Sequence, residues 1–202
     1  MDFQYDTIKG APVAWSDNFI TEDEVDKVYY ECNKIKELGL LTSETGGAIA
    51  REDESLMKSN KGVFLEELYT YYSLSETLKI YFDKIHQETF IKKMEQIHPY
   101  FATLERNGHS STLVSYYEAS DYYKAHADAS FLTIILWVYE GIKSFSGGDL
   151  VIENELTIEC KKGRILFMPG WLKHEVTPVN MSKENQGKGL GRYSVSQFVV
   201  TR

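Results

Sequence analysis

The residues in this sequence whose types and spacing could do chemistry are two histidines and one aspartate. His126 and Asp128 stand two positions apart in "YKAHADASF", directly before a strongly apolar run. Residues two apart on a β-strand point to the same side, so this pair would offer a ring nitrogen and a carboxylate oxygen to one point. His174, in "MPGWLKHEVTPV", follows a Pro-Gly turn on a further predicted strand and is the candidate for a third ligand.

Two imidazoles and one carboxylate are a known type of metal-ligand set. Such a triad leaves open coordination positions and suits Fe(II) in oxygenases. His and Asp also bind Zn(II), and an open zinc site can activate water, so the triad by itself leaves hydrolysis open. His86, His98 and His109 occur in a helical run, before a proline and in a turn-like stretch, and we interpret them as structural or surface residues.

The C-terminal strand favours the oxygenase. In "GRYSVSQFVV", strand alternation places Arg192 and Ser194 on one face and Tyr193 on the other. If the Arg192 face is the barrel interior, the guanidinium needs an anionic partner, because an unpaired buried charge is strongly destabilising. A dicarboxylate cosubstrate would supply that partner, whereas a zinc-dependent hydrolase gives Arg192 no clear task.

Composition restricts the class of protein. The 202 residues are 43% hydrophobic and 13% aromatic, which is enough for one domain with a sizeable core. The net charge of -8 offers no general attraction for nucleic acid or an anionic membrane surface, so neither partner is expected. The sequence has neither a basic leader nor a bilayer-length apolar segment, and we predict a cytoplasmic protein. Cys32 and Cys160 fit no disulfide framework or metal motif and are predicted to be buried.

The first half of the chain is predicted to be mainly helical. An amphipathic helix begins after Thr21, whose side chain is the expected N-cap, with Glu24 in the capping-box position. A helical period returns over residues 65–97, with a split into two helices near Ser75. Phe82 belongs to the apolar stripe of this second region, so we expect it to be buried.

The second half is predicted to be β. Short β-branched or aromatic runs, separated by turn residues, follow one another from residue 112 onwards. Eight such runs match a double-sheet jelly roll, that is, a double-stranded β-helix. We therefore predict an α+β fold in which a jelly-roll core carries the N-terminal helices on one face. Residues 1–202 would form a single domain, with 1–100 as a mainly helical support region and 101–202 as the jelly-roll catalytic core.

With these features in this order, the chain resembles the Fe(II)/2-oxoglutarate dioxygenases, and specifically their prolyl 4-hydroxylase-like branch. The resemblance covers roughly residues 112–201, about half the chain. It rests on Tyr116 ten residues before His126, the His126-x-Asp128 pair, the Gly147-Gly148-x-Leu150 turn, "RILFMPGWLKHEVTPV" with His174, and "GRYS" with Arg192 and Ser194. The match depends on the order of these motifs and on their strand context taken together.

The resemblance implies an iron site and a cosubstrate site. The three predicted ligands would bind Fe(II), and 2-oxoglutarate would chelate the iron and leave a position for O2. Arg192 would form a two-pronged salt bridge to the far carboxylate of 2-oxoglutarate, with the hydroxyls of Ser194 and Tyr116 as hydrogen-bonding helpers. The implied reaction hydroxylates an unactivated C–H bond, with a prolyl residue as the favoured target, and releases succinate and CO2.

Two features depart from the family pattern. Some relatives carry a tyrosine that contacts the cosubstrate near the position where this chain has Leu136-Trp137. Arg192 follows His174 by 18 residues, a longer separation than is usual in the family. The extra residues, "NMSKENQGKGLG", are typical of an extended hairpin loop, and we predict that this loop projects without changing the strand register. A shift of one residue would turn Arg192 outward.

The sequence leaves the substrate open. Residues 40–62, with a short strand expected at 46–50, and residues 180–191 are candidate lids by their length and polarity. The expected partner is a peptide or small-molecule substrate. Two other functions stay open, a non-catalytic jelly-roll binding module and a zinc-dependent hydrolase, and the presence of the whole triad together with Arg192 argues against the first.

Overall fold

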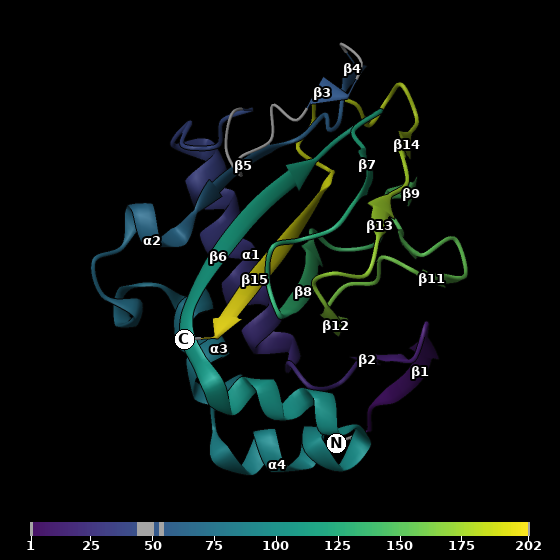
Figure 1. The fold of residues 1–202 in the computed structure, drawn as a ribbon. Helices are drawn as coiled ribbons and strands as arrows, with labels where there is room; N and C mark the ends of the chain where they lie inside the picture. Colours follow the sequence, from purple (N-terminus) through teal and green to yellow (C-terminus); the bar gives the residue numbers. More distant parts are fainter. Residues whose placement is uncertain (1, 44–50, 53–54, 202) are drawn as a thin grey trace.

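Two antiparallel β-sheets form the centre of this computed structural model, which describes residues 2–43, 51–52 and 55–201 (Figure 1). The larger sheet has seven strands, in the order β1 (Gln4–Ile8), β2 (Ala11–Ser16), β12 (Ile165–Pro169), β8 (Leu132–Tyr139), β15 (Arg192–Thr201), β6 (Asn107–Tyr117) and β5 (Lys61–Phe64). The smaller sheet has the order β11 (Leu156–Ile158), β10 (Leu150–Ile152), β13 (His174–Val176) and β7 (Tyr123–His126). Two short pairs complete the strands, β14 (Val179–Met181) with β9 (Phe145–Gly147) and β3 (Arg51–Glu52) with β4 (Ser55–Leu56).

The predicted jelly-roll core with helices on one face is confirmed. Strand β15 shows how the layers divide, because alternate side chains on it face different partners. Tyr193 and Val195 join the core cluster that also contains the helix residues Val28 and Tyr81, so this face of the sheet is covered by helices. The opposite face packs against the smaller sheet. There Trp137 of β8 belongs to a second core cluster, together with residues of β10 and β11. The cavity described below lies between the two sheets.

Helix α1 (Glu22–Glu37) begins as the sequence predicts. The Thr21 side chain accepts a hydrogen bond from the backbone N–H of Glu24, and the Glu24 carboxylate accepts one from the backbone N–H of Thr21, which completes the capping box. Its buried positions, at helical spacing, are Val25, Val28, Cys32 and Ile35. Cys32 and Cys160 are both free and buried, as predicted.

The region after residue 64 contains more elements than the two predicted helices. They are α2 (Leu65–Leu68), the 3-10 helix η1 (Tyr72–Leu74), α3 (Glu76–Ile85), α4 (Glu88–Ile97) and the 3-10 helix η2 (Pro99–Arg106). Ser75 does mark a helix start, since its hydroxyl accepts the backbone N–H of Leu78 at 3.1 Å. The predicted burial of Phe82 is wrong: its side chain is exposed and stacks on Tyr72, because α3 buries the neighbouring face that carries Leu78 and Tyr81.

Strands from the first hundred residues also join the larger sheet, which the sequence prediction missed. β1 and β2 form a hairpin that extends the sheet beyond β12, and β5 pairs with β6 at the other edge. The turn residues Lys9 and Gly10 both have positive φ, as a two-residue hairpin turn requires. Residues 1–100 are therefore not only a helical support but also supply strands of the jelly-roll sheet.

The long loop before β15 keeps the register that the sequence predicts. Arg192 lies opposite Tyr117 of β6 and Tyr139 of β8, so the added residues do not shift the strand. The loop does not project freely, because the Asn185 side-chain amide donates to the Ser144 carbonyl and the Ser144 hydroxyl donates to the Leu190 carbonyl. The short strand expected at residues 46–50 lies outside the described residues. None of the described helices is both long and apolar enough to span a bilayer.

One ion pair attaches the N-terminal hairpin to the jelly roll. Asp17 follows β2 and Arg164 precedes β12, and the guanidinium donates to both carboxylate oxygens, Nε to Oδ1 at 2.6 Å and Nη2 to Oδ2 at 3.1 Å. Lys161 donates to the same carboxylate at 2.6 Å. The Arg164 hydrogen bonds, aided by Lys161, lower the pKa of Asp17 from 3.8 to about 2.

This shift predicts a pH-dependent contribution to stability. Because the folded pKa of Asp17 is depressed, its stabilisation is fully present above pH 3.8 and is lost as the pH falls through about 2. Urea unfolding should therefore give a difference in the free energy of unfolding between wild type and Asp17→Asn that becomes smaller as the pH falls from 3.8 to about 2. In an Arg164→Gln background the Asp17→Asn substitution should have a much smaller effect. A gap that stays constant with pH would contradict the assignment.

Candidate metal centre

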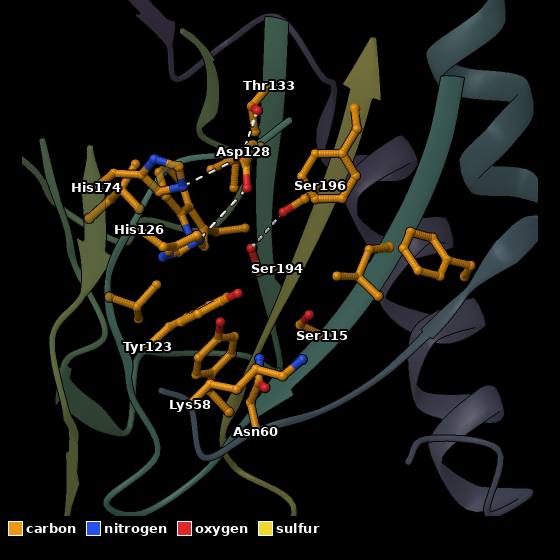
Figure 2. A pocket seen from close by; sticks show the side chains of 18 residues that line it. Lys58, Asn60, Ser115, Tyr123, His126, Asp128, Thr133, His174, Ser194 and Ser196 are labelled. Atoms are coloured by element: carbon orange, nitrogen blue, oxygen red, sulfur yellow. Dashed lines mark hydrogen bonds and ion pairs between the residues drawn. The ribbon is translucent and has the colours of Figure 1, made fainter. Parts of the chain in front are cut away.

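His126, Asp128 and His174 meet at one point between the sheets (Figure 2). His126 ends β7 and His174 begins β13, and the antiparallel pairing of these strands puts the two histidines directly opposite each other. Asp128 lies on the connection to β8, with Oδ1 at 3.7 Å from His126 Nε2 and Oδ2 at 3.5 Å from His174 Nε2. One ligand atom from each residue lies within 4.8 Å of the others. The structure thus brings together the three side chains that the sequence singled out.

Backbone carbonyls hold both imidazoles in the same way. His126 Nδ1 lies 2.8 Å from the Lys124 carbonyl, and His174 Nδ1 lies 2.8 Å from the Leu172 carbonyl. A carbonyl can only accept, so Nδ1 carries a proton on each ring, and in the neutral ring Nε2 is the nitrogen that presents a lone pair to the shared point. Burial and the adjacent His174 lower the pKa of His126, which favours the neutral form that a metal ligand must have.

Asp128 is restrained by one side-chain and one backbone hydrogen bond. Thr133 Oγ1 donates to Asp128 Oδ2 at 2.7 Å, and Ser130 Oγ lies 2.9 Å from Thr133 Oγ1. The backbone N–H of Asp128 donates to the Gly170 carbonyl at 2.8 Å, which joins the Asp128 loop to the turn before His174. A Cβ at Gly170 would lie 2.3 Å from Ser130, so only glycine allows this approach. Partners of this kind orient metal ligands in other proteins.

A cavity extends from the triad between the sheets and is partly polar. Its walls combine serines of β6 and β15 with aromatic side chains from both sheets (Figure 2). Lys58 and Asn60 contribute from the segment before β5. The side chains that line it are Lys58, Asn60, Phe64, Leu113, Ser115, Tyr117, Tyr123, His126, Asp128, Thr133, Ile135, Trp137, Leu150, His174, Val176, Ser194, Ser196 and Phe198.

Arg192 lies on the interior face of β15, as predicted, next to this cavity. It shares that face with Ser194, and its guanidinium carbon lies 4.2 Å from the ring centre of Tyr117, which lines the cavity. The side chain is 0% exposed, and among the described residues none of its three nitrogens has a hydrogen-bond partner. Leaving a buried charge unpaired is strongly destabilising, so this position fits an anionic group that binds beside it.

Gly148 makes room for the guanidinium. A Cβ at this position would lie 2.8 Å from Arg192 Nε, and the backbone has φ of +69°, which disfavours other residues. The sequence had suggested only a turn-forming role for Gly147 and Gly148. The structure adds that Gly148 also allows the close approach of Arg192.

The prediction for Tyr116 is wrong, while Ser194 is placed as expected. Tyr116 points to the helix side of β6, packs against Tyr193 with ring centres 4.9 Å apart, and accepts the backbone N–H of Gly191. It does not line the cavity. The next residue, Tyr117, does, because neighbouring residues on a strand face opposite sides. Ser194 lines the cavity, with Oγ at 3.4 Å from Ser196 Oγ.

Several cavity residues were missed by sequence reasoning. Thr133 could have been found, because it shares a face of β8 with Ile135 and lies close to Asp128 in the chain. Lys58 and Asn60 carried no signal. They reach the cavity because residues 57–59 pair with β7, through hydrogen bonds from Ser59 N to Tyr122 O and from Lys124 N to Met57 O.

Comparisons with known proteins find similarity in the second half of the chain and in the overall fold. Residues 112–200 match the family model of the 2OG-Fe(II) oxygenase superfamily. A Pseudomonas putida prolyl-4-hydroxylase structure superposes with a TM-score of 0.61 at 16% identity, covering 94% of this chain and 92% of that one. A Trichoplax adhaerens prolyl hydroxylase, in complex with a peptide fragment of the hypoxia inducible factor oxygen degradation domain, gives a TM-score of 0.60 at 14% identity, covering 94% and 83%. No curated protein sequence matches the chain significantly.

The segment that matches the 2OG-Fe(II) oxygenase superfamily, residues 112–200, carries the triad and Arg192. The chain as a whole has the fold seen in the two prolyl hydroxylase structures. The family uses Fe(II), 2-oxoglutarate and O2, and the His-Asp-His donor set has the chemistry that Fe(II) requires.

The hydrogen bond from Thr133 gives a testable prediction for this centre. Thr133→Val keeps the shape of the side chain but removes the donor to Asp128, so it should weaken divalent cation binding by about tenfold or more. Mn(II) binding can be followed by electron paramagnetic resonance. Ser130→Ala, one hydrogen bond further from the carboxylate, should have a smaller effect. Mn(II) binding by Thr133→Val equal to that of wild type would show that this bond does not support the centre.

Proposed function

We propose that the protein is an Fe(II)- and 2-oxoglutarate-dependent dioxygenase that hydroxylates a prolyl residue of a peptide and releases succinate and CO2. The observation that carries this proposal is the combination of a His-Asp-His donor set with the buried, unpaired guanidinium of Arg192 beside the same cavity. The donor set by itself is compatible with hydrolysis. The guanidinium supports a cosubstrate that carries a second anionic group.

In this proposal His126, Asp128 and His174 hold Fe(II) and contribute one ligand atom each. The bound iron supplies the redox chemistry that activates O2 and couples it to oxidative decarboxylation of 2-oxoglutarate. The carbonyls of Lys124 and Leu172 take up Nδ1 of the two imidazoles and leave Nε2 of each free to bind the metal. It also keeps the carboxylate in place through Thr133.

Arg192 would bind the distal carboxylate of 2-oxoglutarate. The guanidinium is a rigid fork whose paired N–H groups match the two oxygens of a carboxylate. Its contact with the Tyr117 ring, at 4.2 Å, restrains its plane, and burial strengthens the electrostatic attraction. Ser194, on the same face of β15, offers a hydroxyl to the cosubstrate.

The cavity wall near the triad suits an apolar ring. Phe198 lies opposite Thr133 in the β8–β15 pairing, which places it beside the strand position that supports Asp128. Phe64 packs against Phe198 with ring centres 6.5 Å apart, and Leu113 completes this side. A pyrrolidine ring could pack here with little loss of hydrogen bonding, which supports proline as the target. The two prolyl hydroxylase structures share the fold, and one of them holds a peptide.

Succinate release tests the proposal. With Fe(II), 2-oxoglutarate and O2, proline-containing peptides should stimulate succinate release and gain one oxygen atom by mass spectrometry. The same peptides with alanine in place of proline serve as matched controls and should do neither. His174→Ala should lower turnover at least a hundredfold, because the Fe(II) site would lose one of its protein ligands. Ester cleavage supported by Zn(II), with no succinate formed under any condition, would identify a hydrolase and contradict the proposal.

A further inference from the structure

The ring of Tyr123 lies flat against the imidazole of His126. Their centres are 3.6 Å apart and their planes differ by 12°. His174 approaches the same imidazole at 4.4 Å with a tilt of 55°. In Figure 2 the His126 ring lies between those of Tyr123 and His174. The imidazole therefore has an aromatic contact with each neighbour, and that with Tyr123 is the closer and more parallel one.

His126 depends on such a contact more than His174 does. The His174 side chain is 4% exposed and its strand lies inside the smaller sheet, between β10 and β7. The His126 side chain is 17% exposed, and β7 is a four-residue strand at the end of that sheet. The pairing of β7 with β13 is also irregular after His174. The strand backbone therefore restrains His126 less than it restrains His174.

Residues 57–59 hold Tyr123 from the edge of β7 that is opposite β13. Residues 57–59 pair there with Tyr122 and Lys124 through two backbone hydrogen bonds of 3.0 and 2.7 Å. An isolated bridge joins Lys58 to Tyr123, and the Lys58 ammonium lies 5.7 Å from the centre of the Tyr123 ring. The segment before β5 thus contacts the ring that contacts His126.

We propose that Tyr123 is a positioning residue that fixes the orientation of the His126 imidazole and so sets the metal affinity of the centre. The proposal rests on the proposed function insofar as it concerns a bound metal. The phenol ring restricts rotation of the imidazole about its Cβ–Cγ bond, while the Lys124 carbonyl fixes the protonated nitrogen. Residues 57–59 reach the metal centre through this ring.

A first test uses the metal-free protein. The Tyr123 ring should shift the imidazole proton resonances of His126 upfield, because the protons lie over the ring face. Tyr123→Phe keeps the ring and should keep these shifts, whereas Tyr123→Leu should lose them. Tyr122→Leu removes a ring of the same size from a neighbour that does not line the cavity, and should leave them unchanged. His126 resonances that are the same in wild type and Tyr123→Leu would overturn the proposal.

A second test measures Mn(II) affinity by electron paramagnetic resonance. Tyr123→Leu should bind Mn(II) roughly tenfold more weakly than wild type, as expected when a partner that orients a ligand is removed. Tyr123→Phe keeps the contacting ring and Tyr122→Leu leaves it in place, so both variants should bind Mn(II) within about twofold of wild type.

The outcomes separate this inference from the proposed function. Equal loss of Mn(II) affinity and of melting temperature in Tyr123→Leu and Tyr122→Leu would indicate a folding role and overturn the proposal. Wild-type protein that binds no Mn(II) would contradict the proposed function, and with it the role in metal affinity. Normal wild-type binding together with an unaffected Tyr123→Leu variant would contradict the positioning role alone.

Discussion

A guanidinium that is removed from water and lacks a hydrogen-bond partner is the constraint on which this account depends. A fold accommodates such a group when an anion binds beside it, because the cost of leaving the charge unpaired is large. Three features keep Arg192 in place: the register of β15 turns it inward, Gly148 leaves room for it, and the Tyr117 ring covers one face. The interior of the jelly roll is thus built around a charge that the described side chains do not neutralise.

The triad depends on the same jelly-roll geometry. Its two histidines come from adjacent antiparallel strands of the smaller sheet, and the aspartate comes from the connection that crosses to the larger one. Each imidazole donates through Nδ1 to a carbonyl two residues earlier in the chain, so the local backbone determines that Nδ1 carries a proton. Thr133 belongs to the larger sheet, and its bond to Asp128 joins the centre to the strand that lies beside β15.

The features that could be predicted from the sequence follow from local rules. The capping box at Thr21 needs only nearest-neighbour geometry. His126 and Asp128 do meet, but Asp128 lies on the connection after β7 and not on the strand that the period-two argument assumed. Tyr116 was chosen by counting from His126, but which of two adjacent tyrosines faces inward is decided by the pairing of Tyr117 with Arg192, a contact between distant strands.

The other strands and cavity residues that the sequence prediction missed also depend on pairing between distant segments. β1 and β2 were missed because β2 is buried by pairing with β12, far along the chain, and β1 is added to the sheet through β2. Lys58 and Asn60 reach the cavity only because residues 57–59 pair with β7. The ligand triad was predictable, since His126 and His174 lie in short strand-like runs and Asp128 follows His126 by two residues. The residues that form the cavity wall were not predictable, because pairing between strands far apart in the chain brings them together.

The most direct measurement compares the binding of 2-oxoglutarate and 2-oxobutyrate, which lacks the distal carboxylate, to the anaerobic Fe(II) protein. Binding can be followed through the visible charge-transfer band of the iron–keto acid complex. Wild type should prefer 2-oxoglutarate by roughly 10- to 100-fold, the size expected for hydrogen bonds between charged groups. Arg192→Gln should lose most of this preference while its affinity for Fe(II) stays unchanged. An Arg192→Gln variant that discriminates as wild type does would show that the buried guanidinium does not bind the cosubstrate.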